Sequence, residues 1–136
     1  MKTDLFTFKL TVPPEAIDEL DHVNNVTYLQ WCLDAAEKHW ISKTSRSIRD
    51  TYVWIVLNHN ISYKNPAFKG EELEVKTRIT SYEGVKSTRE YRIIRPADNK
   101  ILVEAETLWC FLNAKTRRPM RIPAEIAALF VNGVSG

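Results

Sequence analysis

The first forty residues combine a two-residue alternation with a longer stretch of helical spacing. Residues 6–12 alternate large apolar side chains with Thr and Lys, which is typical of a half-buried strand. Pro13-Pro14 ends this strand, because proline has no N–H to donate to a sheet. From Asn25 to about Ile41 apolar positions recur every three or four residues, which predicts a helix with one buried face. That face comprises Tyr28, Trp31, Cys32, Ala35, Ala36, His39 and Trp40.

After this helix the pattern of apolar residues changes to a period of two and keeps it. Polar residues 42–50 predict a loop with a short helical turn. Strands are expected at residues 53–63, 71–81, 85–95 and 101–112, since these segments alternate and are rich in β-branched and aromatic side chains. Short turns separate them, so consecutive strands are expected to pair antiparallel. Pro123 then begins a last short helix.

The order of these elements limits the possible folds. One long helix cannot cover both faces of a five-stranded sheet. The sequence therefore predicts an α+β fold in which a curved, five-stranded antiparallel sheet wraps around one long helix. Residues 1–136 are expected to form a single domain. The outer face or an edge of the sheet is left for a partner.

Composition excludes several classes of protein. A hydrophobic content of 44% and a charged content of 26% are ordinary for a soluble chain, and a net charge of +2 is too small to indicate nucleic acid as a partner. No apolar run reaches the roughly 20 residues of a membrane span, and the N-terminus does not resemble a signal peptide. Cys32 and Cys110 lie in apolar patterns, as buried reduced thiols do. We expect a cytoplasmic protein.

The turn before the long helix holds the strongest chemical signal. Asp18 and His22 lie four residues apart, and Asn24 and Asn25 lead directly into the helix. A carboxylate held there can lie near a bound electrophile while free backbone N–H groups at the helix start polarise its oxygen. The same residues would also serve simply as a well-capped helix start. The chain's three histidines lack metal-ligand spacing, so neither a metal nor another cofactor is expected.

Three stretches of sequence resemble one known family. Residues 18–31 read D-x-x-x-H-V-N-N-x-x-Y-x-x-W, residues 60–71 read N-I-S-Y-x-x-P-A-x-x-G-E, and residues 118–123 read R-P-x-x-I-P. Together they resemble the hot-dog-fold thioesterases, specifically the 4-hydroxybenzoyl-CoA thioesterase-like group, and more distantly the plant acyl-ACP thioesterases. The resemblance covers nearly the whole chain.

The resemblance implies a set of catalytic roles. The carboxylate of Asp18 would attack the thioester carbonyl or activate water to do so, and the backbone N–H at or next to Asn25 would hold the thioester oxygen. His22 matches a histidine of the acyl-ACP branch and could hydrogen-bond Asp18. Two positions depart from that branch, which has Asn where this chain has Leu20 and a catalytic Glu where it has Pro66. A scheme centred on Asp18 fits better.

Tyr28, His59 and Asn60 are the candidate substrate-binding residues. The spacing of Tyr28 favours the core, with the acyl slot as its alternative role. His59 is expected on one face with Leu57 and Ile61, as a hydrogen-bonded core or interface histidine. Among the basic residues, Lys86 and Arg89 are expected on a solvated edge, with the phosphates of coenzyme A as the other possible contact.

The predicted function is hydrolysis of acyl-CoA or acyl-carrier-protein thioesters. In such enzymes the protomers pair edge to edge, so we expect a homodimer or homotetramer in which Asp18 of one protomer faces residues 58–63 of the other. Two alternatives stay open. One is a non-catalytic acyl-CoA-binding or carrier-interacting module of the same fold. The other is a 3-hydroxyacyl-thioester dehydratase, which needs a His and a carboxylate placed beside the substrate carbonyl.

Overall fold

The computed structural model describes residues 3–131. Its elements match the predicted order, with small differences at their ends. They are β1 (Phe6–Thr11), the 3-10 turn η1 (Pro14–Ala16), α1 (Asn25–Lys43), α2 (Arg46–Thr51), β2 (Tyr52–Tyr63), β3 (Glu72–Glu83), β4 (Lys86–Arg95), β5 (Lys100–Asn113) and α3 (Ala124–Ala128). The helical turn expected within residues 42–50 is the helix α2, whose first N–H groups are capped by the Ser45 hydroxyl oxygen.

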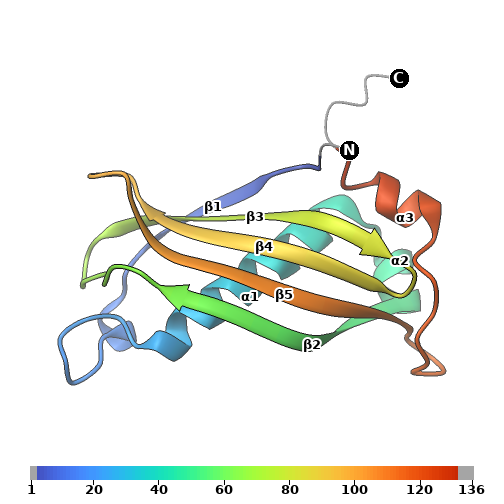
Figure 1. Cartoon of the computed structure of the whole chain (residues 1–136), viewed down its shortest axis with the longest axis horizontal. Helices are drawn as coiled ribbons and strands as arrows, with labels where there is room; N and C mark the ends of the chain where they lie inside the picture. Colours follow the sequence, from blue (N-terminus) through green and yellow to red (C-terminus); the bar gives the residue numbers. More distant parts are fainter. Residues whose placement is uncertain (1–2, 132–136) are drawn as a thin grey trace.

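The strands form one antiparallel sheet in the order β1-β3-β4-β5-β2 (Figure 1). The expectation that all consecutive strands pair is wrong for β2 and β3, because β2 joins β5 at the far edge. The segment that connects β2 to β3 passes the start of α1 and does not form a tight hairpin. Ala67 in this connection accepts a hydrogen bond from Val23 N at 2.9 Å, so the chain is held against the start of α1 before β3 begins.

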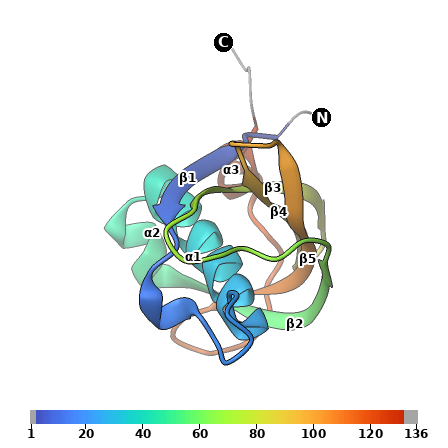
Figure 2. The ribbon, with the colours of Figure 1, turned by 90° about the vertical axis from the view of Figure 1, so that its left-hand side faces the viewer.

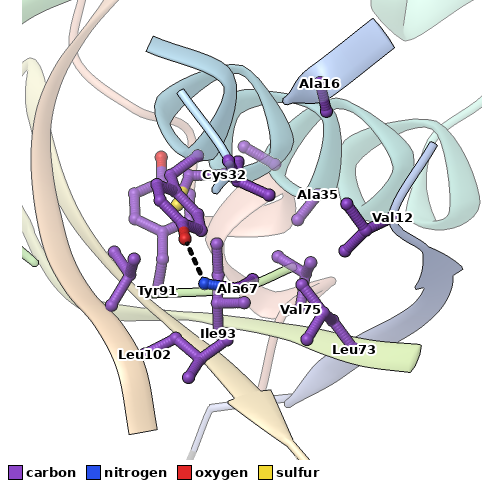
Figure 3. Packing of buried hydrophobic residues seen from close by; sticks show 14 residues of the cluster. Val12, Ala16, Cys32, Ala35, Ala67, Leu73, Val75, Tyr91, Ile93 and Leu102 are labelled. Carbon is purple, nitrogen blue, oxygen red and sulfur yellow. Dashed lines mark hydrogen bonds between the residues drawn. The ribbon is translucent and has the colours of Figure 1, made fainter. Parts of the chain in front are cut away.

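The sheet curves around α1, which lies inside the arc of strands (Figure 2). The predicted helical face is confirmed for Tyr28, Cys32, Ala35, Ala36 and His39, which are its buried residues, whereas Trp31 and Trp40 are half-buried. Small side chains on this face let the helix approach the sheet closely. Figure 3 shows the resulting core packing. Burial raises the pKa of the Cys32 thiol to about 12, so this cysteine is an unreactive core residue at neutral pH.

The two edges of the sheet differ in length and chemistry. The edge strand β1 spans six residues and carries Lys9. The other edge strand, β2, spans twelve residues without a charge or a proline, and exposes Ile55, Val56 and Leu57. A bulge near Leu57 interrupts its pairing with β5. None of the helices between residues 3 and 131 is long and apolar enough to cross a membrane.

Candidate active site

A tight loop before α1 carries the candidate catalytic carboxylate. An isolated bridge joins Ile17 to Val23, and the backbone N–H of Asp18 donates to the carbonyl of His22 at 3.0 Å. Asp21 takes the left-handed conformation that closes the loop, with φ of 65°. These bonds place Asp18 and His22 beside each other at the base of the loop.

The side chains of Asp18 and His22 make separate contacts. Oδ1 of Asp18 accepts a hydrogen bond from Leu20 N at 2.8 Å, whereas Oδ2 has no hydrogen bond within residues 3–131. The nearest partner of His22 Nδ1 is the carbonyl oxygen of Val23, at 3.2 Å. The described structure therefore contains no Asp18–His22 side-chain hydrogen bond, and one carboxylate oxygen stays available for chemistry.

The start of α1 offers an open backbone donor. Asn24 is the N-cap, because its Oδ1 accepts from Val26 N at 2.8 Å and its carbonyl accepts from Thr27 N at 2.9 Å. Across the described part of the chain, the N–H of Asn25 has no hydrogen-bond partner, and this residue is exposed. The helix dipole places partial positive charge at this position. An oxygen with developing negative charge would be stabilised there.

The second sequence motif braces the first. Ala67 receives a hydrogen bond from Val23 N and donates its own N–H to the Tyr28 hydroxyl oxygen at 2.8 Å, the bond drawn at Ala67 in Figure 3. The Tyr63 hydroxyl donates to the carbonyl of Asn25 at 3.2 Å. The end of β2 and the turn after it thus fix the position of the helix start.

The three candidate substrate-binding residues lie in different surroundings. Tyr28 is only 2% exposed, and burial raises the pKa of its hydroxyl, so it is a core residue next to the helix start. His59 points inward, with Nδ1 2.8 Å from the Thr107 hydroxyl. Asn60 is exposed on the opposite face of β2. The structure brings Tyr28 alone into the neighbourhood of Asp18 and Asn25.

The bulge also corrects the expected grouping of residues along β2. Leu57 was expected to share the face of His59 and Ile61, but it is 47% exposed. The register shift between Val56 and Asn58 leaves Leu57 without a paired residue on β5. His59 and Ile61 keep their inward orientation.

A second polar group, which sequence reasoning missed, lies near the other end of α1. His39 is fully buried, with Nε2 2.8 Å from Asp4 Oδ2 and Nδ1 2.8 Å from Arg89 Nη1. Arg89 Nη1 also donates to the Thr77 hydroxyl oxygen at 3.1 Å, and Lys43 pairs with Asp4 at 3.3 Å. Burial and the nearby Arg89 charge lower the pKa of His39 to about 4, so its imidazole is neutral at pH 7.

The placement of Arg89 on a solvated basic edge is wrong, because Arg89 is only 5% exposed. Its spacing of two residues from Tyr91 and four from Ile93 was the available signal, since all three lie on the inner face of β4. A charged side chain is expected at the surface, and this expectation was given more weight than the spacing.

Comparison with known proteins identifies the class of fold and then the family. A 1,4-dihydroxy-2-naphthoyl-CoA thioesterase from Synechocystis superposes with a TM-score of 0.80 at 21% identity, covering 92% of this chain and 94% of its own. A mutant 4-hydroxybenzoyl-CoA thioesterase in complex with 4-hydroxybenzoyl-CoA superposes at 0.83 with 15% identity, covering 93% and 98%. The predicted hot-dog fold is confirmed.

Sequence comparison agrees with the fold. The Escherichia coli acyl-CoA thioester hydrolase YbgC is 26% identical over 133 residues, covering 96% of this chain and 98% of its own. The profile of the thioesterase-like superfamily matches residues 12–130. This chain belongs to the thioesterase-like superfamily.

Proposed function

We propose that this protein hydrolyses acyl-CoA thioesters, with the carboxylate of Asp18 and the backbone N–H of Asn25 as its catalytic groups. The observation that carries the proposal is the open donor at the helix start beside a carboxylate with one unbonded oxygen. A thioester oxygen at Asn25 N would gain negative charge as the carbonyl is attacked, and the donor and helix dipole would stabilise that charge.

Two routes are open to the Asp18 carboxylate. It can attack the carbonyl carbon to give a mixed anhydride with release of the thiolate, after which water hydrolyses the anhydride. It can instead remove a proton from an attacking water. His22 is a positioning residue in either route, because it lies at the base of the same loop and contacts the carbonyl of Val23.

We propose that the active form is a homodimer joined through β2. An uncharged, proline-free edge strand presents free N–H and C=O groups to another chain, and natural monomers usually protect such edges. Ile55 and Leu57 are 43% and 47% exposed on this strand. Antiparallel pairing of two β2 strands about a two-fold axis would cover both copies.

This pairing changes which part of the partner would face the site. The chain's own Tyr63 already contacts Asn25, so its own end of β2 borders the helix start. A two-fold axis near the middle of β2 brings the first half of the partner's strand, residues 52–56, to that position. This proposal therefore differs from the expectation from the sequence, in which residues 58–63 of the partner face the site.

The decisive experiment compares Asp18→Asn with Asp21→Asn. Both remove one carboxylate from the same loop, and Asn tolerates the left-handed conformation of Asp21. We expect Asp18→Asn to lower kcat by about 100-fold or more, and Asp21→Asn to stay near wild type. Free-thiol release is measured with short, long and aromatic acyl-CoA thioesters and with an acyl-carrier-protein thioester, after size-exclusion chromatography confirms folding.

Different failures of this experiment point to different alternatives. Wild-type rates in Asp18→Asn would show that the site is wrong even if the activity is real. Tight binding of thioesters with no thiol release from any of them would favour the non-catalytic binding module. Hydration of an enoyl-CoA in place of thiol release would favour the dehydratase.

A further inference from the structure

A cavity of about 390 Å³ lies between the second half of α1, the first half of β2 and the inner face of the sheet. Its volume falls within the ~300–1,000 Å³ typical of ligand pockets. Most of its lining is apolar, and includes Leu33, Trp40, Val53, Val56 and Trp109. Such a cavity suits a hydrocarbon chain along most of its length.

Three charged residues contribute to this lining, Glu37, Arg49 and Arg89, and of these only Arg89 is buried. The Arg89 side chain reaches the cavity although the residue is 95% buried, at 5% exposure. A guanidinium has five N–H donors, and the bonds to His39 and Thr77 both come from Nη1. For Nε and Nη2 no hydrogen-bond partner is found within residues 3–131, and no carboxylate there forms an ion pair with Arg89.

The positive charge of Arg89 is not balanced nearby. Asp4 is linked to it only through the neutral His39, and Asp4 is already paired with Lys43. Glu37 contributes to the cavity lining, but it is exposed and makes no ion pair with Arg89. Burial lowers the pKa of Arg89 to about 10, which still leaves a cation at neutral pH. A buried cation without a partner is costly, so an anion in the cavity would be bound strongly.

We propose that this cavity holds the acyl group of the substrate and that Arg89 binds a carboxylate at its far end. The preferred substrates are then CoA thioesters of dicarboxylic acids, whose free carboxylate accepts hydrogen bonds from Nε and Nη2 in the bidentate geometry that Arg favours. This inference rests on the proposed thioesterase function and on the homodimer.

The proposed dimer places the cavity next to the catalytic groups. Within one chain the cavity lies along the second half of α1, with Leu33 about 12 Å from Asn25 at the helical rise of ~1.5 Å per residue. Antiparallel pairing of β2 sets residues 52–56 of one protomer beside the Tyr63 end of the other. The cavity of one protomer therefore adjoins the Asn25 donor of its partner, and an acyl chain can run from the thioester to Arg89.

The test uses matched pairs of substrates that differ only at the far end of the acyl chain. Octanoyl-CoA ends in a methyl group and octanedioyl-CoA in a carboxylate, and the pair is repeated for shorter and longer chains. For the wild type we expect kcat/KM to be about tenfold or more higher for the carboxylate-ended member at the best length, mainly through KM. Equal values, or a preference for the methyl-ended member at every length, would overturn the proposal.

Two variants connect the preference to the residue. Arg89→Met should abolish the ratio between the two substrates, while Arg89→Lys should keep part of it because the charge remains. Arg92→Met is the matched control, since Arg92 lies on the same strand but is exposed on its other face. A preference that survives in folded Arg89→Met would contradict the proposal.

A binding measurement tests this inference independently of the proposed hydrolysis. It also needs no Arg89 variant, so it remains possible if those variants do not fold. Calorimetry on Asp18→Asn compares octanoyl-CoA with octanedioyl-CoA without turnover, and we expect about tenfold tighter binding of the latter. If no thioester is hydrolysed but this difference is found, the cavity assignment stands and the hydrolase proposal fails. If thioesters are hydrolysed and the two bind equally, the hydrolase stands and the cavity assignment fails.

Discussion

The two ends of helix α1 meet polar groups of opposite kinds. At the N-terminal end, Asp18 and Asn25 are solvent-accessible. Asp18 is hydrogen-bonded within its own loop, and the Asn25 carbonyl accepts a bond from Tyr63 at the end of β2. Toward the C-terminal end, His39 and Arg89 are buried and are linked to Asp4 through a continuous chain of hydrogen bonds. One end leaves groups free on the surface, and the other leaves donors free in a cavity.

This difference suits two separate roles, catalysis at the N-terminal end of α1 and substrate selection near its C-terminal end. Open groups at a helix start can respond to charge that develops during a reaction, because solvent and substrate reach them. A buried cation must be held by fixed neighbours, and it selects the groups that can enter the cavity. The proposed dimer joins the two, since it sets the open end of one protomer against the cavity of the other.

The largest expected effect comes from separating the two protomers, which removes the open end of α1 in one chain from the cavity of the other. We expect the double substitution Ile55→Lys with Leu57→Lys to produce a monomer, because it places charges on the edge that would pair. Thioesterase activity should fall by about 100-fold, since the acyl chain loses its cavity. Sedimentation velocity gives the oligomeric state and thiol release gives the activity.

Leu5→Lys is the matched control for this double variant. Leu5 is 45% exposed and precedes the opposite edge strand, β1. It should leave both the assembly and the rate unchanged. An active monomer of the Ile55/Leu57 variant would show that one chain is sufficient for catalysis.

The open end could be predicted from the sequence, and the buried end could not. Asp18, His22 and Asn25 lie within a few residues of one another, so local turn and helix rules bring them together. Arg89, Thr77 and His39 come from two strands and the helix, and they become neighbours through the register of β3 on β4 and the packing of α1 against the sheet. The position of β2 next to β5 at the edge of the sheet could not be predicted either, because alternation of apolar and polar residues predicts strands but not their order in the sheet.

The next effect concerns the buried end and appears as pH-dependent stability. The pKa of His39 is about 4 in the folded protein, against ~6.5 in an unfolded chain. Between these values the unfolded state binds more protons, so stability is lost as the pH falls from about 6.5 to about 4. We expect the free energy of unfolding to drop by about 2 kcal/mol between pH 7 and pH 5 from this group. Urea unfolding at both pH values measures it.

His39→Gln isolates this contribution. Gln keeps one donor for Asp4 and one acceptor for Arg89 but does not titrate. The fall between pH 7 and pH 5 should therefore be smaller in the variant by that same amount. Asp4, whose lowered pKa lies below its usual value of 3.8, titrates below this range. An identical fall in the two proteins would place the pH sensitivity elsewhere.

The smallest expected effect tests the open end, where the cap of α1 fixes the direction of the Asn25 donor. Asn24→Ala removes the side-chain oxygen that accepts from Val26 N and should lower the free energy of unfolding by about 1 kcal/mol. Asn24→Ser supplies another capping oxygen and should restore most of it. If Asn25 N–H is the donor to the thioester oxygen, as proposed, it needs a firmly held first turn, so kcat should fall several-fold in Asn24→Ala and recover in Asn24→Ser. A loss of stability without any change in kcat would mean that the first turn holds its donor without the cap. Tyr63, which donates a hydrogen bond to the Asn25 carbonyl, would then be the group that keeps this end in place.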